Sequence, residues 1–462
     1  MKQLLKFKKW CELVGLDIKE HQLSGFEWCN SHEVDNRPLK GGLLCDEMGL
    51  GKTVLMLGCI VTNPLNRTLI VVPPALIIQW EKCIEKFLLF DVFVFHGAAA
   101  KIPIEELLKH KIVLTTYGMI AKRSQEYISP LWNIQWDRLI CDEAHHLRNA
   151  KTKICRGASR IQADIKWMVT GTPIQNKTND IKVLFTILGK LIYGRTELLE
   201  HINEYVLRRT KKGVGINLPT IENENIIVEW ESKKEENLAA SIHTALDFSG
   251  VSLDTVNDIM GQLNYDSPLP LFVRARQVCI DSNLLKPCIL KLQRSGLIPP
   301  DFQMTKITTT SKLTAVINKV LSEPKNVKKI IFSFYKKEID TLAERLRAKS
   351  YSVGILDGRT KKKERRDLQE PTFSQPDVLI IQIQSGSEGL NLQHFSQVYF
   401  TSPHWNPGVE DQSIARVHRI GQTKPVQVFR FQMAPFHNGL TLENYCIEVQ
   451  ENKRKLMKLV DQ

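Results

Sequence analysis

Short apolar runs rich in β-branched residues alternate with longer mixed segments in the first half of the chain. Each run ends at a polar or glycine-rich turn with potentially reactive side chains. Such runs are typical of buried strands, and their alternation with helical segments is typical of a parallel sheet. Parallel strands end at one shared edge, so we expect the functional site there. The predicted strands are residues 68–72, 111–114, 138–141 and 167–169.

The same alternation returns after Ser311, whereas residues 211–310 are more polar and have a helical pattern. We therefore predict an α/β protein with two parallel-sheet lobes, separated by a helical insertion and linker. The first lobe spans residues 1–210, the insertion and linker residues 211–310, and the second lobe with a terminal helix residues 311–462. The predicted strands of the second lobe are residues 329–333, 352–356, 378–382, 397–401 and 426–431.

Composition adds an expectation about location and partners. The 462 residues, 43% hydrophobic and 24% charged, suffice for two or three folded domains. No apolar run approaches the roughly 20 residues of a membrane span, and the lysine-rich start lacks a signal-peptide core. We therefore expect a soluble intracellular protein, nuclear or cytoplasmic according to its host and without a membrane partner. The ten cysteines form no CxxC pair, which excludes zinc-ribbon spacing. A net charge of +13 favours a polyanionic partner.

A phosphate-binding loop is predicted after the first apolar segment. The sequence Asp46-Glu-Met-Gly-Leu-Gly-Lys-Thr53 follows apolar residues 42–45 and precedes a helical segment. Glycines let backbone amides converge on phosphates at a helix N-terminus, a lysine reaches the β- and γ-phosphates, and a threonine ligates Mg²⁺. Asp46 stands where the general motif has its first glycine. The predicted nucleotide-binding residues are Asp46, Glu47, Met48, Gly49, Leu50, Gly51, Lys52 and Thr53.

Two adjacent carboxylates, Asp142 and Glu143, follow the predicted strand at residues 138–141. Their place at the carboxyl edge of the sheet suits Asp142 to hold Mg²⁺ and Glu143 to orient and deprotonate an attacking water. The simpler alternative is a helix start at which acidic side chains are favoured by the helix dipole. The upstream Lys52 and Thr53 favour the catalytic interpretation.

Two further segments make a family resemblance specific. Thr170-Gly-Thr-Pro-Ile-Gln-Asn176 and Asp411-Gln-Ser-Ile-Ala-Arg-Val-His-Arg-Ile-Gly-Gln422, together with the two segments above, resemble the SWI/SNF-type branch of superfamily-two helicases. The resemblance implies two RecA-like lobes that bind ATP and Mg²⁺, with adenine recognition by Gln22. It also implies that Arg416 and Arg419 approach the γ-phosphate, and their spacing predicts a shared helix face. The residues implied to couple hydrolysis to movement are Thr170, Gly171, Thr172 and Gln422.

The resemblance also assigns nucleic-acid contacts at the ends of strands in both lobes. Trp405 lies in a Trp-Asn-Pro segment, and packing within the protein is an open alternative to an insertion against nucleic acid. Ser387 stands where the family usually has a glycine. The implied contact residues are Pro73, Thr115, Thr116, Ser385, Gly386, Ser387, Asn391 and Trp405.

Arg208-Arg-Thr-Lys211, Arg276-Gln-Val-Cys279 and Ser311-Lys-Leu313 resemble linker elements of the same branch, although Asp281 and Ser282 replace the usual His-Pro. The resemblance implies a DNA-stimulated ATPase that translocates on double-stranded DNA. The sequence leaves the oligomeric state open, and we expect a monomeric motor. Such a motor remodels or displaces bound protein complexes without obligatory strand separation. The alternatives are a strand-separating DNA or RNA helicase and a nucleic-acid-binding scaffold whose ATPase has decayed.

Overall fold

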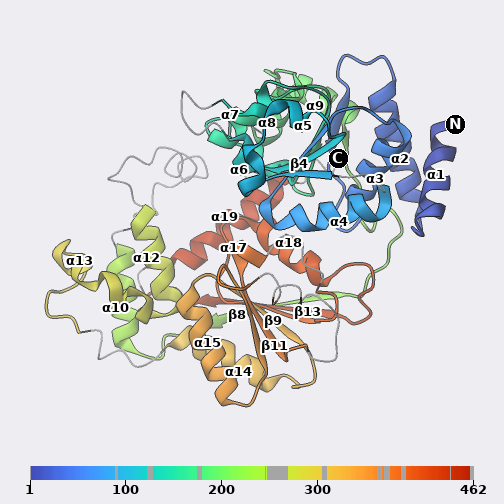
Figure 1. The fold of residues 1–462 in the computed structure, drawn as a ribbon. Helices are drawn as coiled ribbons and strands as arrows, with labels where there is room; N and C mark the ends of the chain where they lie inside the picture. The colour runs from blue at the N-terminus through green and yellow to red at the C-terminus, as the bar shows by residue number, and fades with distance from the viewer. Residues whose placement is uncertain are drawn as a thin grey trace. The chain divides into compact units, whose positions relative to one another are not determined.

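In the computed structural model the chain divides into two compact units (Figure 1). Unit 1 comprises Met1–Asn217 with Lys455–Gln462, and unit 2 comprises Leu218–Arg454. The structure describes residues 2–88, 92–121, 128–173, 179–244, 246, 269–303, 310–361, 364, 367–368, 375–386, 392–437 and 439–457.

Unit 1 is built on a seven-stranded sheet with the order β3-β4-β2-β5-β6-β1-β7, and every pairing between these strands is parallel. All four predicted strands are confirmed. The strands are β1 (Gly41–Leu44), β2 (Thr68–Val72), β3 (Val92–Phe95), β4 (Ile112–Thr116), β5 (Gln135–Asp142), β6 (Gln162–Val169) and β7 (Val206–Leu207).

Alternate residues of these strands enter two different hydrophobic cores, because helices cover both faces of the sheet. Leu69 and Val71 join one core, whereas Ile70 and Val72 join the other. One face carries α1 (Lys2–Leu13), α2 (Glu20–Val34), α3 (Lys52–Thr62) and α4 (Ile77–Leu88); the other carries α7 (Lys153–Ala158), α8 (Asn179–Leu188) and α9 (Arg195–Tyr205). Shorter turns are η1 (Pro74–Leu76), η2 (Gly97–Lys101), α5 (Ile104–Leu107), α6 (Tyr117–Ile120), η3 (Pro130–Trp132) and η4 (Ala144–Leu147).

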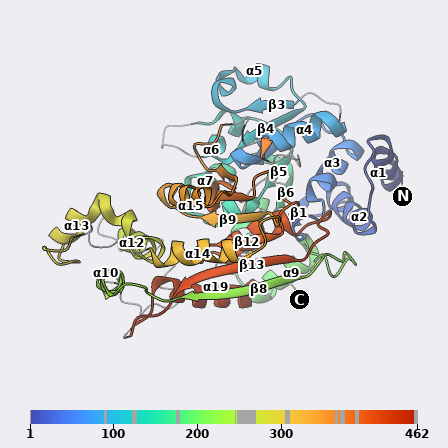
Figure 2. The same cartoon turned by 90° about the horizontal axis from the view of Figure 1, so that it is seen from below.

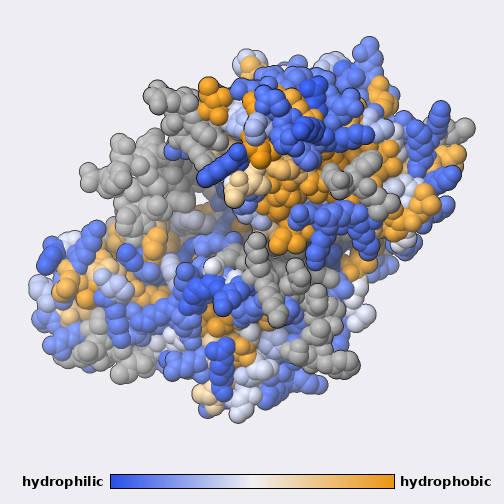
Figure 3. Space-filling model, in the orientation of Figure 1, coloured by the Kyte–Doolittle hydropathy of each residue, from blue (hydrophilic) through white to orange (hydrophobic). Residues whose placement is uncertain are grey.

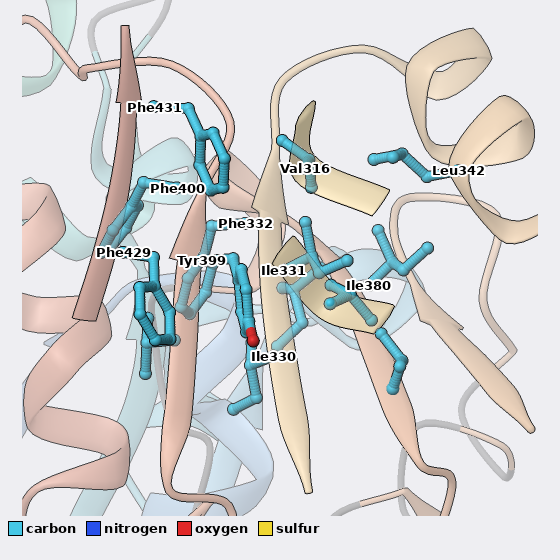
Figure 4. Packing of buried hydrophobic residues seen from close by; sticks show 14 of the residues in the cluster. Val316, Ile330, Ile331, Phe332, Leu342, Ile380, Tyr399, Phe400, Phe429 and Phe431 are labelled. Atoms are coloured by element: carbon cyan, nitrogen blue, oxygen red, sulfur yellow. The ribbon is translucent and has the colours of Figure 1, made fainter. Parts of the chain in front are cut away.

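Unit 2 holds a six-stranded sheet with the order β10-β11-β9-β12-β13-β8, again with parallel pairings. Its five predicted strands are confirmed. Aromatic rings pack against each other across the sheet, with ring centroids 5.2 Å apart for Phe332 and Phe400 and 4.8 Å apart for Tyr399 and Phe429 (Figure 4). The strands are β8 (Ile221–Val228), β9 (Lys329–Ser333), β10 (Val353–Leu356), β11 (Val378–Gln382), β12 (Gln397–Phe400) and β13 (Val426–Met433).

Strand β8 corrects the expectation that residues 211–310 are polar and helical throughout. It runs parallel to β13 at the edge of the sheet, with Ile221 opposite Val426 and Val228 opposite Met433. Most of its side chains are exposed, so its sequence shows no alternation of apolar and polar residues until Ile226. An edge strand of this kind is held by its backbone ladder more than by a buried face.

The helical expectation is confirmed for α10 (Lys233–Thr244), α12 (Leu269–Ile280) and α13 (Ile289–Arg294), which Figure 2 shows grouped beside one end of the unit 2 sheet. They share a small core with the terminal helix α19 (Leu442–Met457). Asp281, which replaces the family's usual residue, accepts a 2.8 Å bond from the Asn283 amide and so caps η5 (Ser282–Cys288). The remaining helices are α14 (Ser311–Ser322), α15 (Lys336–Ala348), α17 (Ile383–Gly386) and α18 (Pro407–Val417).

Two buried carboxylates tie α14 to its neighbours. The Lys312 ammonium donates to Glu443 at 2.6 Å, with both side chains 1% exposed. The Ser311 hydroxyl donates to Glu235, whose burial raises its pKa to about 7 against the opposing effect of that hydrogen bond. The Ser311-Lys312-Leu313 segment is therefore an anchor between the helical part of unit 2 and its sheet.

We expect Glu235→Gln to stabilise unit 2 increasingly as the pH rises. A carboxyl whose pKa is raised in the folded state favours folding below its ordinary pKa, and that stability is lost as the pH rises through about 7. Glutamine keeps an acceptor for Ser311 without this loss, so its advantage should grow by on the order of 2 kcal/mol between pH 5 and pH 8. Urea unfolding at both pH values measures this change, and an advantage that does not vary with pH contradicts it.

Hydrophilic residues cover much of the surface seen in Figure 3, and hydrophobic residues form patches between them. Within the described part of the chain, no helix combines the length and apolar character needed to cross a membrane.

Candidate active site

The phosphate loop joins the end of β1 to the start of α3, as the sequence predicts. Gly49 (φ 91°) and Gly51 (φ 86°) adopt left-handed backbone conformations that favour glycine, and α3 begins at Lys52. The loop thus curls around the N-terminus of α3, where backbone amides bind anions. The Lys52 ammonium donates to the Asp46 carbonyl at 2.8 Å, so its charge lies within the curl of the loop. Thr53 follows in the first helical turn, half-buried.

Helix α2 brings Gln22 to the same loop. The Gln22 side-chain oxygen accepts a 3.0 Å bond from the Lys19 amide. A Cβ atom on Gly51 would overlap with the Gln22 amide nitrogen, which places this side chain directly against the loop. The ring of His21 forms a second link, a 3.2 Å hydrogen bond to the Leu50 carbonyl.

Asp142 is the last residue of β5 and is held on both carboxylate oxygens. The Trp80 indole donates to one oxygen at 2.8 Å, and the Glu143 amide donates to the other at 2.9 Å. Burial, followed by the neighbouring Glu143 carboxylate, raises the pKa of Asp142 to about 6, while the Trp80 bond and Lys52 oppose this shift. Glu143 itself has a left-handed backbone (φ 51°), a strained conformation for a non-glycine residue that re-aims the chain after the strand.

A chain of contacts links Glu143 to the predicted coupling residues. The His145 ring lies 3.4 Å from the Glu143 carboxylate and forms a 3.2 Å hydrogen bond with the Thr170 hydroxyl, which accepts a 3.2 Å bond from the Thr172 amide. A Cβ atom on Gly171 would lie 3.5 Å from the Lys52 ammonium. Unit 1 therefore brings the phosphate loop, the two carboxylates and residues 170–172 together.

In unit 2, the prediction that Arg416 and Arg419 share a helix face is wrong, because α18 ends at Val417. His418 leaves the helical conformation (φ −92°, ψ 80°), and its ring forms a 2.7 Å hydrogen bond with the Pro219 carbonyl. Arg416 lies in the last helical turn and Arg419 in the turn beyond it. Burial and the nearby Arg416 guanidinium lower the pKa of Arg419.

Gln422 cross-links the segments around these arginines. Its amide nitrogen donates to the carbonyls of Gln393 at 2.9 Å and Phe395 at 2.8 Å, and its oxygen accepts bonds from the Thr423 and Lys424 amides at 3.0 Å. The segment ahead of Gln393 is also tied to α18, since the Leu392 amide donates to the Arg416 carbonyl at 3.0 Å. The segment from Arg416 to Arg419, here called the arginine turn, is therefore bonded directly to residues 392–395, and a movement of one would move the other.

The predicted nucleic-acid residues of unit 1 are buried. The Thr115 hydroxyl donates to the Phe95 carbonyl at 2.8 Å, the Thr116 hydroxyl contacts the His96 ring at 3.4 Å, and Pro73 precedes η1. Their exposed neighbours are Pro74, Ala75 and Gly118. In unit 2, Ser385 and Gly386 lie in the short helix α17, directly after β11. Ser387 and Asn391, and Gln175 and Asn176 of the coupling motif, lie outside the described residues.

Trp405 packs within unit 2, which supports the alternative left open by the sequence. Its ring lies 6.0 Å from Phe272 and 5.7 Å from Tyr445, centroid to centroid, and its backbone carbonyl accepts a 3.0 Å bond from Lys453. The indole is partly buried against the helical core.

Sequence reasoning missed Trp80 as a support of Asp142. It also missed that Arg209 and Lys211 bind the phosphate loop. Their basic run was visible in the sequence, but only the tertiary fold shows that they pair with Asp46 and Glu47.

The donor set fits a magnesium-bound nucleotide. Mg²⁺ in phosphate sites takes one or two protein oxygens and completes its shell with phosphate and water. Thr53 and Asp142 would supply those oxygens, and the metal would neutralise charge that develops on the phosphates. Within the described residues no group of three or more acidic, histidine or cysteine side chains has the arrangement of a dedicated metal cage, so a shared site of this kind is the one that fits.

We expect Trp80→Phe to weaken the response of the ATPase to Mg²⁺. Phenylalanine keeps the packing but removes the donor to Asp142, leaving a buried carboxylate oxygen less well held, at a cost of about 1 kcal/mol or more. The Mg²⁺ concentration for half-maximal activity should rise roughly five- to tenfold. Trp28→Phe in α2 is the matched control, and equal magnesium dependence in both variants contradicts the role given to Trp80.

The chain is similar to two known domain families and to several known proteins. The SNF2-related domain matches residues 21–197, and the helicase conserved C-terminal domain matches residues 311–421. A putative SWI/SNF-related matrix-associated actin-dependent regulator of chromatin, subfamily A member 3-like 1, from Arabidopsis thaliana is 26% identical over 92% of this chain and 67% of its own length. A probable global transactivator of Orgyia pseudotsugata multicapsid polyhedrosis virus is 28% identical over 90% and 86% of the two chains.

A solved structure of the Sulfolobus solfataricus SWI2/SNF2 ATPase core in complex with dsDNA aligns with 96% of this chain and 92% of its own, at 24% identity and a TM-score of 0.40. The two matched domains carry the phosphate loop, the carboxylate pair and the arginine turn described above. The chain therefore belongs to the SNF2-related, SWI/SNF-type family of helicase-like ATPases.

Proposed function

We propose that this ATPase is stimulated by double-stranded DNA and translocates along it, remodelling or displacing bound proteins without obligatory strand separation. The observation that carries the proposal is the contact chain from Glu143 through His145 to Thr170 and Thr172, beside Lys52. This chain gives hydrolysis a physical route to the motif that couples it to movement. The net charge of +13 supports a phosphate backbone as the track.

The proposed chemistry in unit 1 follows from the residues in place. Lys52 and the amides at the N-terminus of α3 bind the phosphates, and Gln22 contacts the adenine. Thr53 and Asp142 hold the magnesium ion. Glu143 orients the attacking water and accepts its proton, and the His145 ring lies 3.4 Å from the Glu143 carboxylate while bonded to Thr170.

The proposed cycle uses the second unit as a movable source of positive charge. Arg416 and Arg419 reach the γ-phosphate when the units close on ATP, and they release it after hydrolysis. If each unit grips the DNA differently in the two states, each cycle moves one unit along the duplex. Gln422 transmits the change, because it joins the arginine turn to residues 393–395.

The DNA contacts are proposed at the strand ends of both units. In unit 1, the buried Thr115 and Thr116 shape the turn, and the exposed Pro74, Ala75 and Gly118 beside them allow close approach of a phosphate backbone. In unit 2, the proposed contact residues are Ser385 and Gly386, which follow β11, together with Ser387 and Asn391 on the family resemblance alone. Contacts of this type carry no sequence information, which suits a motor that moves along any duplex.

Two assays on the full chain test the proposal. Phosphate release should rise with duplex DNA more than with single-stranded DNA or RNA, and a third strand bound to the duplex should be displaced with ATP. The Glu143→Gln variant is the inactive control. Robust unwinding of bare duplex would favour the strand-separating helicase instead, and stimulation by RNA alone would overturn the assignment of the track.

A further inference from the structure

The phosphate loop of unit 1 carries two carboxylates, which is an electrostatic difficulty for a site that binds a polyanion. Asp46 is fully buried, and the Glu47 side chain is 42% exposed. Together with Lys52 they give residues 46–53 a formal charge of −1. Like charges a few ångströms apart repel strongly in a partly buried site. Other groups must therefore neutralise these carboxylates before the loop attracts a triphosphate.

Arg209 neutralises Asp46. Its Nε donates to Asp46 Oδ1 at 3.0 Å, a terminal nitrogen donates to Oδ2, and its backbone amide donates to Oδ1 at 3.0 Å. The guanidinium also donates to the Ser24 hydroxyl at 3.1 Å and to the His21 carbonyl, on the helix that carries Gln22. A planar fork with five donors suits this set of acceptors, which a lysine could not satisfy.

Lys211 neutralises Glu47 in the same way. Its backbone amide donates to Glu47 Oε2 at 2.7 Å, and its ammonium lies 3.3 Å from Oε1. The backbones run side by side as well, since the Glu47 amide donates to the Arg209 carbonyl at 2.9 Å. Arg208, the residue before Arg209, donates to the Gly171 carbonyl of the coupling motif at 3.3 Å.

The sequence leaves room for this arrangement in two places. Asp46 occupies the position of the first glycine in the general phosphate-loop motif, and its carboxylate points to Arg209. Gly25 lies where the guanidinium passes, because a Cβ atom there would overlap with a terminal nitrogen of Arg209. The ion pair between Arg209 and Asp46 therefore explains both the aspartate at position 46 and the glycine at position 25.

We propose that Arg209 and Lys211 are positioning residues for ATP: they cancel the charges of Asp46 and Glu47 and thereby allow the phosphate loop to bind a triphosphate. With these two cations the formal charge of the loop and its partners changes from −1 to +1. The inference rests on the proposed role of residues 46–53 as the nucleotide site, and it does not depend on translocation or on the identity of the track.

The test measures the affinity of the full chain for a fluorescent ATP analogue with Mg²⁺ and without DNA. Arg209→Ala should weaken binding at least tenfold, because an uncompensated carboxylate then faces the phosphates. Adding Asp46→Asn to Arg209→Ala should recover most of the affinity, since it removes that carboxylate. The pair Lys211→Ala and Lys211→Ala with Glu47→Gln should show the same pattern with smaller changes, because Glu47 is more exposed.

Two further variants separate charge from folding. Gly25→Ala keeps every charge but pushes a terminal nitrogen of the Arg209 guanidinium aside, so it should weaken binding less than Arg209→Ala does. Arg195→Ala, an exposed arginine in α9 of the same unit, should leave affinity unchanged. If Arg209→Ala does not fold, Arg209→Gln, which removes the charge but keeps a long polar side chain, carries the measurement.

Two results would overturn the proposal. One is an affinity within twofold of the wild type for a folded variant that has lost the Arg209 contact. The other is a loss of affinity that Asp46→Asn fails to repair, because that result gives Arg209 a structural role and not an electrostatic one. If the folded wild-type protein does not bind the ATP analogue at all, that result would instead contradict the assignment of residues 46–53 as the nucleotide site.

Discussion

Glu143→Gln should bind ATP with nearly the affinity of the wild type but hydrolyse it about 10²- to 10⁴-fold more slowly. Glutamine has almost the same shape as glutamate but cannot accept the proton of the attacking water. The neighbouring Asp142 does not take over, because its carboxylate is assigned to the magnesium ion and is held by Trp80 and the Glu143 amide. Single-turnover hydrolysis and nucleotide binding, measured on the same preparation with duplex DNA, separate the two effects.

Glu85→Gln, an exposed substitution on α4 of the same unit, is the matched control and should leave both quantities unchanged. Turnover of Glu143→Gln within a fewfold of the wild type would show that another group activates the water. Loss of ATP binding together with turnover would mean instead that Glu143 supports the shape of the loop around the nucleotide.

Most strands of the two sheets could be predicted because parallel strands are buried on both faces, which makes each one a short, nearly continuous apolar run. Residues 68–72 and 329–333 match β2 and β9 in full for this reason. The short strands β3 and β7 were not predicted. Strand β8 has no such run, since its position at the sheet edge leaves Glu222 to Asn225 exposed. Its pairing with β13 depends on a backbone ladder between segments about two hundred residues apart, which local sequence patterns do not encode.

The sequence was sufficient to predict the active-site residues of unit 1, but not the contacts that hold them. Motif spacing identified Lys52, Asp142 and Glu143, because each follows a strand of the same sheet. The hydrogen bond from Trp80 to Asp142 and the pairing of Arg209 with Asp46 join residues 62 and 163 positions apart. Such pairs depend on how helices and loops return to the strand ends, and nothing in the local sequence marks them.

The end of α18 shows how a tertiary contact overrides a local spacing rule. Residues three apart share a face only while the helix continues. His418 forms a hydrogen bond to the Pro219 carbonyl, 199 positions away, and the helix ends one residue before it. Tertiary contacts also change the expectation for Thr115 and Thr116. Their hydroxyls contact the Phe95 carbonyl and the His96 ring, and both side chains are buried.

Replacing both Arg416 and Arg419 by alanine should abolish DNA-stimulated hydrolysis and spare nucleotide binding. Guanidinium groups supplied to the γ-phosphate stabilise charge that grows only in the transition state, an effect of about 10³ to 10⁵ in rate in other enzymes of this type. Nucleotide affinity should change little, because the binding residues lie in unit 1. Phosphate release with and without duplex DNA, beside binding of a fluorescent analogue, measures both quantities, and Arg294→Ala on α13 is the exposed control.

The variants Arg416→Ala and Arg419→Ala should respond differently when each is combined with Gln422→Ala. Because the helix ends between them, Arg416 is fixed by the last turn of α18, whereas Arg419 depends on the turn that Gln422 holds through Val417, Gln393 and Phe395. Gln422→Ala should therefore reproduce much of the Arg419→Ala defect and add little to it in the double variant, while its effect should add to that of Arg416→Ala. Unchanged stimulation in the double-arginine variant would show that unit 2 does not supply charge to the nucleotide. Equal coupling of Gln422 to both arginines would show that the two act as one rigid group despite the break in the helix.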